Sequence, residues 1–288
     1  MKPQRLKIES IATQSFSARC DSLPDINNNW HYHSESELIY FKKGRGTQFI
    51  GDSVKRFEDG DIVLLDGNLP HFWQYDPAYF IDKSANPIEV YVIHFSKNHL
   101  LDVLLNIPEC SEISKAIERS KRGLSIKGET CERVGTIIQS ITTANGFKRL
   151  ILLLDALYET AICSDIEYLA SFGFKVPLNN DAYHRLQLVY NYTITNYKKK
   201  ISISEIADIA KVSPNSFCRF FKSQTGKHYS YFTNEVRIGH ARKFLLDNKL
   251  NIKSICHECG FKNPVSFYKT FKIVTGFTPL VYQKMHHQ

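Results

Sequence analysis

Candidate metal ligands gather in the first quarter of the chain. His31, His33 and Glu37 lie close together in the sequence, and His71 follows later. His31 and His33 are two residues apart, so both rings face the same side if this segment is a β-strand. Three imidazoles and one carboxylate suit divalent iron, manganese, nickel or zinc. The four residues are therefore candidate ligands of a divalent metal ion.

The spacing resembles the first cupin motif, His-x-His-x3-Glu-x6-Gly, which is matched throughout by His31, His33, Glu37 and Gly44. The second cupin motif is matched in part, because Gly60 and His71 agree with it but Tyr75 stands where the motif has Asn. In cupin enzymes the matching positions hold a divalent metal. The resemblance implies a small β-barrel around the site and a metal-dependent oxygenase or isomerase as one function for it.

The same side chains can instead bind an organic molecule. Imidazoles and carboxylates form hydrogen bonds with sugar hydroxyls or with an acid. Residues that can stack on a sugar ring or another flat ligand follow at Trp30, Phe72, Trp73 and Tyr75. We interpret the group as an effector pocket made of His31, His33, Glu37, His71 and Trp73. A metal site at these residues, and a packed site that binds nothing, stay open as alternatives.

Short strands are the elements that would position these residues. Runs of β-branched and aromatic residues alternate with Gly, Asp and Asn turns, which is typical of a small barrel or sandwich. The predicted strands lie at about residues 5–17, 37–42, 47–50, 53–57, 61–65 and 90–95. Polar loops are predicted at 21–29 and 76–87, and the second is a candidate lid over the pocket.

Helical periodicity begins near Lys97. Apolar residues recur at helical spacing as far as Leu124, again over Val134–Ile141, and again over Phe147–Ser171. The last helix either covers the barrel or joins two copies of the chain, and the sequence leaves both open. Residues 173–182 contain Gly, Pro and Asn without periodicity and are predicted to form a linker.

A duplicated motif organises the last third of the chain. Residues 201–222 and 251–272 superpose at an offset of 50, which becomes 49 before the turn. Each copy is predicted to be a short helix, a tight turn and a second helix that begins at Pro214 or Pro264. The buried stripes of the second helices are predicted to contain Phe217, Phe220, Phe221, Phe267, Phe271, Ile273 and Val274.

Capping residues predict where these helices begin. Ser204 and Ser213 are the expected N-caps of the first copy, and Ser254 and Asn263 open the helices of the second. A further helix is expected before them at His184–Tyr197. A helix-turn-helix places its second helix in the DNA major groove, and two such units can read successive groove faces about 34 Å apart.

The charge distribution assigns DNA contact to this part of the chain. Residues 183–288 contain 17 Lys and Arg against 5 Asp and Glu, a net charge of +12. The whole chain has 37 − 29 = +8, so residues 1–182 carry −4. Only the basic part suits the phosphate backbone. Lys198, Lys199 and Lys200 follow the expected helix and are candidate phosphate contacts.

The duplicated region resembles the AraC/XylS family of bacterial transcription regulators. The resemblance covers about residues 186–284 and rests on Gly260-Phe261, Phe267–Lys272, Thr275–Pro279 and Tyr282. It implies a linking helix at about Tyr229–Leu246 and DNA contacts by Asn215, Ser216, Cys218, Arg219, Lys222, Pro264, Val265, Ser266, Tyr268, Lys269 and Lys272. Pro264-Val265 replaces a polar pair common in the family. The second unit is therefore expected to make mainly phosphate and apolar contacts.

The cysteines do not indicate a second metal site. Cys256 and Cys259 are close in sequence, but no second ligand pair lies at a zinc-site spacing. Their i, i+3 spacing predicts buried core thiols instead. The seven cysteines have no disulfide-framework spacing and no signal peptide precedes them, so we expect free thiols in a reducing cytoplasm. No apolar run is long enough to span a membrane.

These features predict an α+β protein of two domains. A cupin-like β-barrel with flanking helices is expected at residues 1–172, a linker at 173–182 and an all-α DNA-binding domain at 183–288. The expected function is a ligand-responsive, sequence-specific regulator, without enzymatic activity, that activates a metabolic operon such as one for carbohydrate use. Its expected partners are promoter DNA, a small effector, RNA polymerase and a second copy of the chain. The alternatives are a metal-dependent cupin enzyme fused to a DNA-binding tail, and a DNA-binding protein without an effector.

Overall fold

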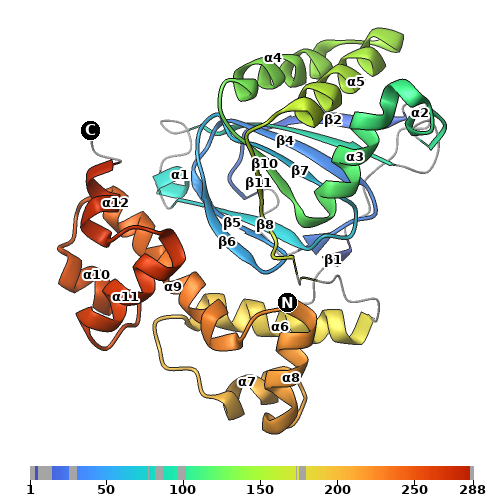
Figure 1. The fold of residues 1–288 in the computed structure, drawn as a ribbon. Coiled ribbons are helices and arrows are strands. Elements are labelled where there is room, and N and C mark those ends of the chain that lie inside the picture. Colours follow the sequence, from blue (N-terminus) through green and yellow to red (C-terminus); the bar gives the residue numbers. More distant parts are fainter. Residues whose placement is uncertain are drawn as a thin grey trace. The chain divides into compact units, whose positions relative to one another are not determined.

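Strands make up most of the first part of the chain and helices make up the last part (Figure 1). The computed structural model describes residues 4–5, 15–25, 31–76, 78–81, 87–96, 102–172, 174 and 180–285. The chain divides into two compact units, one at Pro3–Val176 and the other at Pro177–Gln288.

Two sheets form the first unit. One has the order β1-β3-β8-β5-β6, which are Gln4–Arg5, His31–Tyr32, His71–Tyr75, Gly46–Ile50 and Ser53–Phe57. The other has the order β11-β10-β7-β4-β9-β2, which are Ile166–Tyr168, Leu124–Ile126, Ile62–Leu65, Ser36–Lys43, Glu89–Phe95 and Phe16–Asp21. Paired strands are antiparallel except for β1 and β3.

Side chains alternate between the faces of the six-stranded sheet, as strand geometry requires. On β4, Ile39 and Phe41 join a core between the two sheets, whereas Leu38 belongs to a core on the outer face. Glu37 shares the inner face and lies opposite His94 of β9 in register. The interior between the sheets therefore combines an apolar core with a few charged and polar side chains.

Helices α3 (Ser111–Arg119), α4 (Thr130–Thr143) and α5 (Gly146–Ile162) pack on the outer face of that sheet (Figure 1). The predicted helical stripe of Val134 and Ile141 is confirmed, because both are fully buried in this layer. Gly135 lets α4 approach the sheet closely, since a Cβ at this position would lie 2.5 Å from the Tyr40 ring.

Three predicted elements of this unit are wrong in part. Leu124 is not helical: after α2 (Asp102–Leu105) and α3 it pairs with Leu64 in the sheet. The helix predicted to reach Ser171 ends at Ile162, because residues 166–168 form β11 and pair with β10. Within the predicted loop 76–87, residues 78–81 form the short helix α1.

The strands predicted between residues 37 and 95 are confirmed to within a residue or two. The first long strand, β2, runs over Phe16–Asp21 rather than 5–17. It pairs along its whole length with β9, and this pairing sets its register. The predicted positions 6–14 lie outside the described residues.

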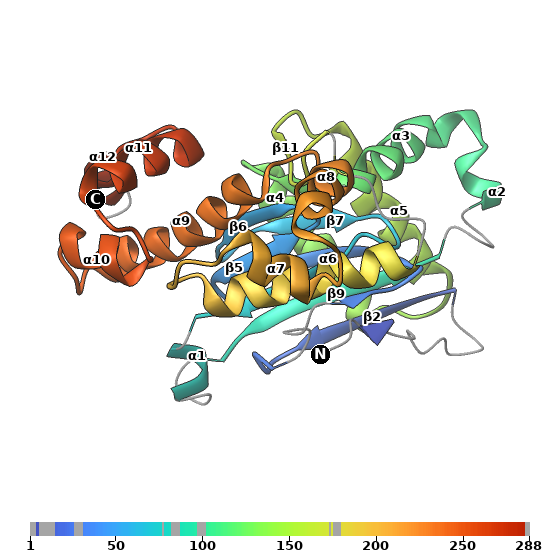
Figure 2. The same cartoon turned by 90° about the horizontal axis from the view of Figure 1, so that it is seen from below.

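The second unit is entirely helical in residues 180–285. Its helices are α6 (Asn180–Asn196), α7 (Ile203–Ile209), α8 (Pro214–Thr225), α9 (Tyr229–Asp247), α10 (Ile252–Glu258), α11 (Pro264–Thr275) and α12 (Pro279–Met285). Figure 2 shows α9 running from the α7–α8 pair to the α10–α12 group. The last three residues of the predicted linker, 180–182, belong to α6.

Side-chain caps fix where the helices begin. Ser202 rather than Ser204 caps α7, where it forms a capping box with Glu205. Asn251 rather than Ser254 caps α10, and its side chain accepts a hydrogen bond from the Ser254 amide at 2.9 Å. Both true caps have the extended backbone that precedes a helix, whereas Ser204 and Ser254 already lie within the first turn. The predicted caps Ser213 and Asn263 are confirmed.

Aromatic residues fill the core of each helix-turn-helix. Phe221 contacts the Tyr229 ring of α9 at a centroid distance of 5.4 Å, and Phe271 contacts the Tyr282 ring at 5.6 Å. Ile273, predicted to be buried, is 60% exposed. It lies two residues after Phe271, which turns its side chain to the other side of the helix.

Candidate DNA-recognition helices and effector cavity

Helices α8 and α11 have the same capped frame. Each begins with Pro after a side-chain cap, has twelve residues and ends at a Gly in the left-handed conformation. The fully buried Phe217 and Phe267 occupy equivalent places in them. The residues predicted to contact DNA therefore occupy equivalent places on two equivalent helices.

On α8 these residues lie outside the core. Ser216 is half-buried, and its hydroxyl accepts a hydrogen bond from the Ser213 hydroxyl at 2.9 Å. It is therefore partly engaged in the cap. The exposed predicted contacts are Asn215, Cys218, Arg219 and Lys222. Among them, Asn215 and Arg219 have the side chains best suited to hydrogen bonding with base edges.

The exposed face of α11 is less polar. Val265 is 80% exposed although its side chain is apolar. Tyr268 is half-buried and packs against the core around Phe267, which makes it the weakest candidate for base contact. The other exposed predicted contacts are Pro264, Ser266, Lys269 and Lys272.

Ion pairs distinguish the cations of this unit. Lys198 and Lys199 were predicted to contact phosphates, but each forms an ion pair within the protein. Lys198 Nζ is 2.7 Å from Glu258 Oε2, and Lys199 Nζ is 2.9 Å from Glu205 Oε1. Within residues 180–285 no ion pair is formed by Arg219, Lys222, Lys269 or Lys272. The charges on these candidate recognition helices are therefore available to phosphates or bases.

Five polar side chains meet inside the barrel. Glu37 Oε2 is 3.0 Å from His71 Nε2 and 3.4 Å from His33 Nε2, and Glu37 Oε1 is 3.2 Å from His94 Nε2. The ring of His31 lies beside that of His71, at a centroid distance of 4.3 Å. All five are buried. The four candidate ligands thus come together, as the motif predicted, and His94 joins them.

These neighbours shift one another's protonation. Burial would raise the pKa of Glu37, but His94, His33 and His71 outweigh it and hold this pKa well below its ordinary value. Burial would lower the pKa of His33, but Glu37 outweighs it and raises this pKa. At His71 burial prevails and lowers the pKa. The carboxylate is therefore ionised, and the two imidazoles differ in their affinity for a proton.

His94 is not among the predicted site residues, although the strand that carries it was predicted at residues 90–95. His94 belongs to neither cupin motif. The available signal was alternation: Val90 and Val92 face the inner core, so His94 must face it too. A histidine on the apolar face of a buried strand needs a partner, and Glu37 is opposite.

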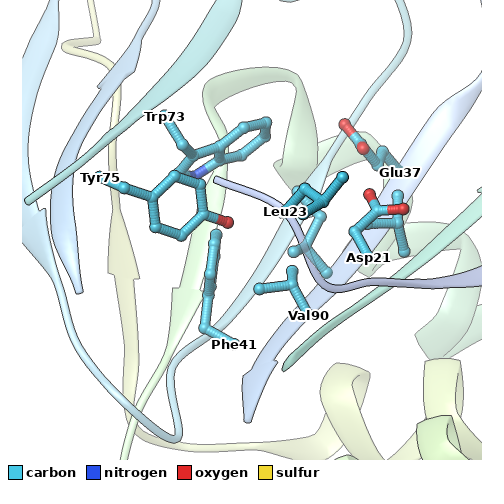
Figure 3. A pocket seen from close by; sticks show the side chains of 9 residues that line it. Asp21, Leu23, Glu37, Phe41, Trp73, Tyr75 and Val90 are labelled. Carbon is cyan, nitrogen blue, oxygen red and sulfur yellow. The ribbon is translucent and has the colours of Figure 1, made fainter. Parts of the chain in front are cut away.

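A small cavity reaches this group at Glu37 (Figure 3). Its aromatic wall contains Trp73 and Tyr75, and the carboxylates of Glu37 and Asp21 lie on the opposite side. The remaining lining residues are Leu23, Ile39, Phe41, Val90 and Val92. The cavity offers about 10 Å³ to the centre of a water molecule, which is space for a single water.

Two members of the predicted effector pocket, Glu37 and Trp73, line this cavity. Among the described residues, the lining does not include His31, His33 or His71. The predicted pocket is therefore divided into a histidine group and a cavity that share Glu37.

Strand alternation also corrects the predicted stacking residues. Trp73 and Tyr75 face the interior of the barrel, but Phe72 faces the other side of β8 and stacks on Phe49 with centroids 4.3 Å apart. Phe72 is therefore not part of the cavity wall. Trp30 lies outside the described residues.

The cysteine pair of α10 is structural. Cys256 and Cys259 are fully buried free thiols in the core that contains Phe267. Burial raises the pKa of Cys259 to about 12, so its thiol stays protonated at neutral pH. The prediction of core thiols is confirmed.

Two family models match the chain. A model of the AraC-like ligand binding domain matches residues 18–161, which is half of the chain, and a model of a helix-turn-helix domain matches residues 206–285. The chain belongs to the AraC family of transcription regulators. It is a ligand-responsive, DNA-binding regulator, and the predicted fold class of a sheet-rich domain followed by a helical DNA-binding domain is confirmed.

Two relatives of this AraC-family chain match it over most of their length and are named as regulators. The lactose operon transcription activator of Staphylococcus xylosus is 23% identical over 249 residues, which are 86% of this chain and 84% of the relative. The probable transcriptional regulator LumQ of Photobacterium leiognathi is 21% identical over 275 residues, which are 95% and 98%. The solved structure of ToxT from Vibrio cholerae O395 covers 95% of this chain and 98% of its own, with 15% identity and a TM-score of 0.37. In the described part of the chain, no helix is long and apolar enough to cross a membrane.

Proposed function

We propose that this regulator activates a metabolic operon and that its effector is a sugar or a similar polyol bound in the barrel. The cavity of Figure 3 carries the proposal, because an indole and a phenol ring face the carboxylates of Glu37 and Asp21 across it. Aromatic rings stack on the apolar face of a sugar, and carboxylates accept hydrogen bonds from its hydroxyls. The name of the Staphylococcus xylosus relative, a lactose operon activator, supports both parts.

Effector binding has to enlarge the cavity, because its present volume suits one water molecule. Leu23 lines the cavity and is 47% exposed, so it can move away at little cost. The indole nitrogen of Trp73 is buried without a hydrogen-bond partner among the described residues. A ligand hydroxyl would give it one. A sugar that binds only the enlarged barrel shifts the population toward that state.

DNA recognition is assigned to α8 and α11. In the first helix-turn-helix, Asn215 and Arg219 form hydrogen bonds with bases, and Lys222 contacts a phosphate. In the second, Val265 supplies an apolar contact, and Lys269 and Lys272 contact phosphates. Activation then needs contact with RNA polymerase at the promoter. Because the relatives are named as regulators, we prefer this function to that of a metal-dependent enzyme with a DNA-binding tail.

The active species is proposed to be a homodimer joined through α5. One face of α5 is buried on the barrel, but the other bears the exposed apolar residues Phe147, Ile151, Tyr158 and Ile162. At 100° per residue they fall within about 60° of one another. Sedimentation velocity should show a dimer that Ile151→Glu dissociates and Ser140→Glu, on exposed α4 surface, does not. A wild-type monomer at all concentrations would exclude the dimer.

Capture of fragmented genomic DNA by the purified protein tests the proposed function. At near-physiological salt, we expect enrichment of a few sites upstream of one gene cluster. The sugars handled by that cluster are then tested for a shift in thermal stability, since a ligand of the folded state raises it. A target cluster with no metabolic genes, together with no stabilising sugar, would contradict the proposal.

Two residues of β8 provide matched variants. Trp73→Ala removes a cavity wall, so the sugar-induced thermal shift should disappear. Phe72→Ala removes an aromatic ring from the opposite face of the same strand and should keep the shift. If both variants lose it equally, the effector does not bind in this cavity.

A further inference from the structure

The histidine group of the barrel has a hydrogen-bonding pattern that ordinary polar packing does not explain. His71 Nδ1 is 2.7 Å from the Leu69 carbonyl oxygen, and His33 Nδ1 is 2.9 Å from that of Glu35. A carbonyl oxygen can only accept, so each Nδ1 carries the hydrogen. In the neutral ring, Nε2 is then a bare lone pair.

Both bare nitrogens face an oxygen that is also an acceptor. His71 Nε2 and His33 Nε2 lie 3.0 and 3.4 Å from Glu37 Oε2. Neither nitrogen, nor Oε2 of Glu37, has a hydrogen-bond partner among the described residues. Buried acceptors turned toward one another repel, and leaving them unpaired costs free energy. A cation at this point removes the repulsion.

The distances fit a metal ion at this point. Bonds of 2.0–2.2 Å from zinc-like ions to imidazole and carboxylate place neighbouring ligand atoms roughly 3.0 Å apart in octahedral and 3.4 Å apart in tetrahedral coordination. The two separations from Glu37 Oε2 are 3.0 and 3.4 Å. A proton is the other cation available. On one ring it would leave the other Nε2 lone pair facing the same oxygen, and on both rings it would leave two imidazolium ions on a single buried carboxylate, an uncompensated charge.

His31 completes the set of ligands. It can supply a ring nitrogen within 4.8 Å of those of His33 and His71, and all three residues are buried. It lies on β3 opposite His71 of β8, so the backbone pairing of these strands holds the two rings together.

His94 has a different role. Its Nδ1 is 3.3 Å from Arg19 Nη1, which can only donate. Nδ1 is therefore the acceptor, and the hydrogen is on Nε2, 3.2 Å from Glu37 Oε1. His94 holds one carboxylate oxygen, which leaves Oε2 facing His33 and His71. Such outer partners orient a metal ligand without binding the metal themselves.

We propose that the barrel binds one divalent first-row transition-metal ion through Nε2 of His33 and His71, Oε2 of Glu37 and a ring nitrogen of His31, with His94 as a positioning residue. Imidazole and carboxylate ligands suit zinc, cobalt, nickel, iron or manganese. The site goes beyond the proposed function. Because Glu37 also lines the effector cavity, a bound metal would place positive charge at its wall.

The test uses the full chain without a histidine tag, freed of metal with a chelator and titrated with Co²⁺. We expect one Co²⁺ per chain, a visible absorption band of N/O-coordinated cobalt without a thiolate charge-transfer band, and displacement by Zn²⁺. Failure of the folded protein to bind Co²⁺ at a one-to-one ratio would overturn the proposal. A thiolate band would also overturn it, because it would place the metal at cysteine.

Variants separate ligands from the positioning residue. His71→Ala and His71→Gln should abolish stoichiometric binding, whereas His94→Gln should weaken it about 10–100-fold and keep the ratio of one. His228→Ala, at the exposed start of α9, is the matched control and should bind as wild type. Circular dichroism checks that each variant is folded, and metal binding is compared only for folded variants. The two His71 substitutions are made so that at least one of them gives a folded protein. Full binding by a folded His71 variant would overturn the site, while DNA capture by the metal-free chain tests the regulator separately.

Discussion

Helix α8 and the equivalent helix α11, fifty residues later, have the same residues at the buried positions but different residues at several exposed positions. Phe217, Phe221, Phe267 and Phe271 are all fully buried. At the exposed positions, however, Arg219 of the first helix corresponds to Lys269 and Asn215 corresponds to Val265. The two helices have the same length and equivalent caps, so their buried faces pack in the same way and need the same residues. The outer face is free to differ, so the two units can make different contacts with DNA.

The turns show a second difference. Lys211 has φ of 53° and Gly260, in the equivalent turn, has φ of 76°. A Cβ at Gly260 would lie 2.5 Å from the carbonyl oxygen of Lys198, two residues beyond the end of α6. Arg237 of α9 also binds this segment, with Nε 2.9 Å from the Tyr197 carbonyl oxygen. The second turn is therefore held against α6, which explains why only glycine fits there.

Removing a buried ring should have the largest effect. Phe221→Ala and Phe271→Ala should each lower the free energy of unfolding by about 3–5 kcal/mol, as is usual for a buried Phe. Hydrogen exchange of the full chain can report each unit separately. If the frames are equivalent, the two losses agree and Lys222→Ala changes neither. A loss in one unit only would show that the other does not depend on its aromatic core.

Gly260→Ala should come next, at roughly 2–3 kcal/mol, because it adds left-handed strain and a clash with α6. Gly276→Ala is the matched control: it has φ of 81° but open space around its Cβ, so only the strain applies. Urea unfolding of both variants measures the difference. Equal losses would show that the contact with α6 contributes nothing.

Arg219→Ala should reduce discrimination between correct and altered operators by about 1–3 kcal/mol, the value of a bidentate base contact. Lys269→Ala, its equivalent in α11, should weaken binding to all sequences alike and reduce the salt dependence. Titrations against single-base operator variants at two salt concentrations separate these outcomes. Identical behaviour of the two variants would refute the division of roles.

The helix-turn-helix of α10 and α11 should be more sensitive to acid than that of α7 and α8. The reason is His240, which lies in the linking helix α9. Burial, with Lys243 and Lys198 nearby, lowers the pKa of His240 to about 4. The folded state therefore resists the proton that the unfolded chain takes up below about pH 6.5, so stability is full above that pH and falls as the pH falls toward 4. Roughly 1 kcal/mol should be lost by pH 6.

Glu205 lies in the capping box of α7, in the first helix-turn-helix. Lys199 and Tyr192 lower its pKa to about 2. Its contribution is present above about pH 4.5 and is lost only as the pH falls toward 2. His240→Phe keeps the ring stacked on Tyr197 and should abolish the loss near pH 6, as measured by thermal unfolding at pH 7.5 and 6. An unchanged pH dependence would assign the effect elsewhere.

The smallest effect is expected at Val265. Its exposed side chain can contact the methyl group of a thymine, worth about 0.8 kcal/mol per buried methyl-sized group. Replacing the contacted thymine by uracil, or Val265 by Ala, should weaken binding by a similar small factor, and both together should cost no more than one alone. Additive losses would show that the methyl and Val265 do not touch.

The helix-turn-helix pair was predictable because its signals are local. Proline after a cap, phenylalanine at i and i+4, and glycine after the last turn fix each helix within a few residues of sequence. The errors, at Ser204 and Ser254, were shifts of two or three residues between neighbouring capping candidates. A repeat whose offset stays at 49 or 50 residues along both helices made the pattern harder to produce by chance.

The sequence alone determined the two-part organisation, the duplicated DNA-binding motif, and the grouping of His31, His33, Glu37 and His71, because periodicity and motif spacing are local properties. Only the tertiary structure brought His94 to Glu37, turned Phe72 away from the cavity and paired residues 166–168 with β10. Each of these depends on strand pairing between distant residues. Register between strands is set by the packing of whole sheets, which no short stretch of sequence contains.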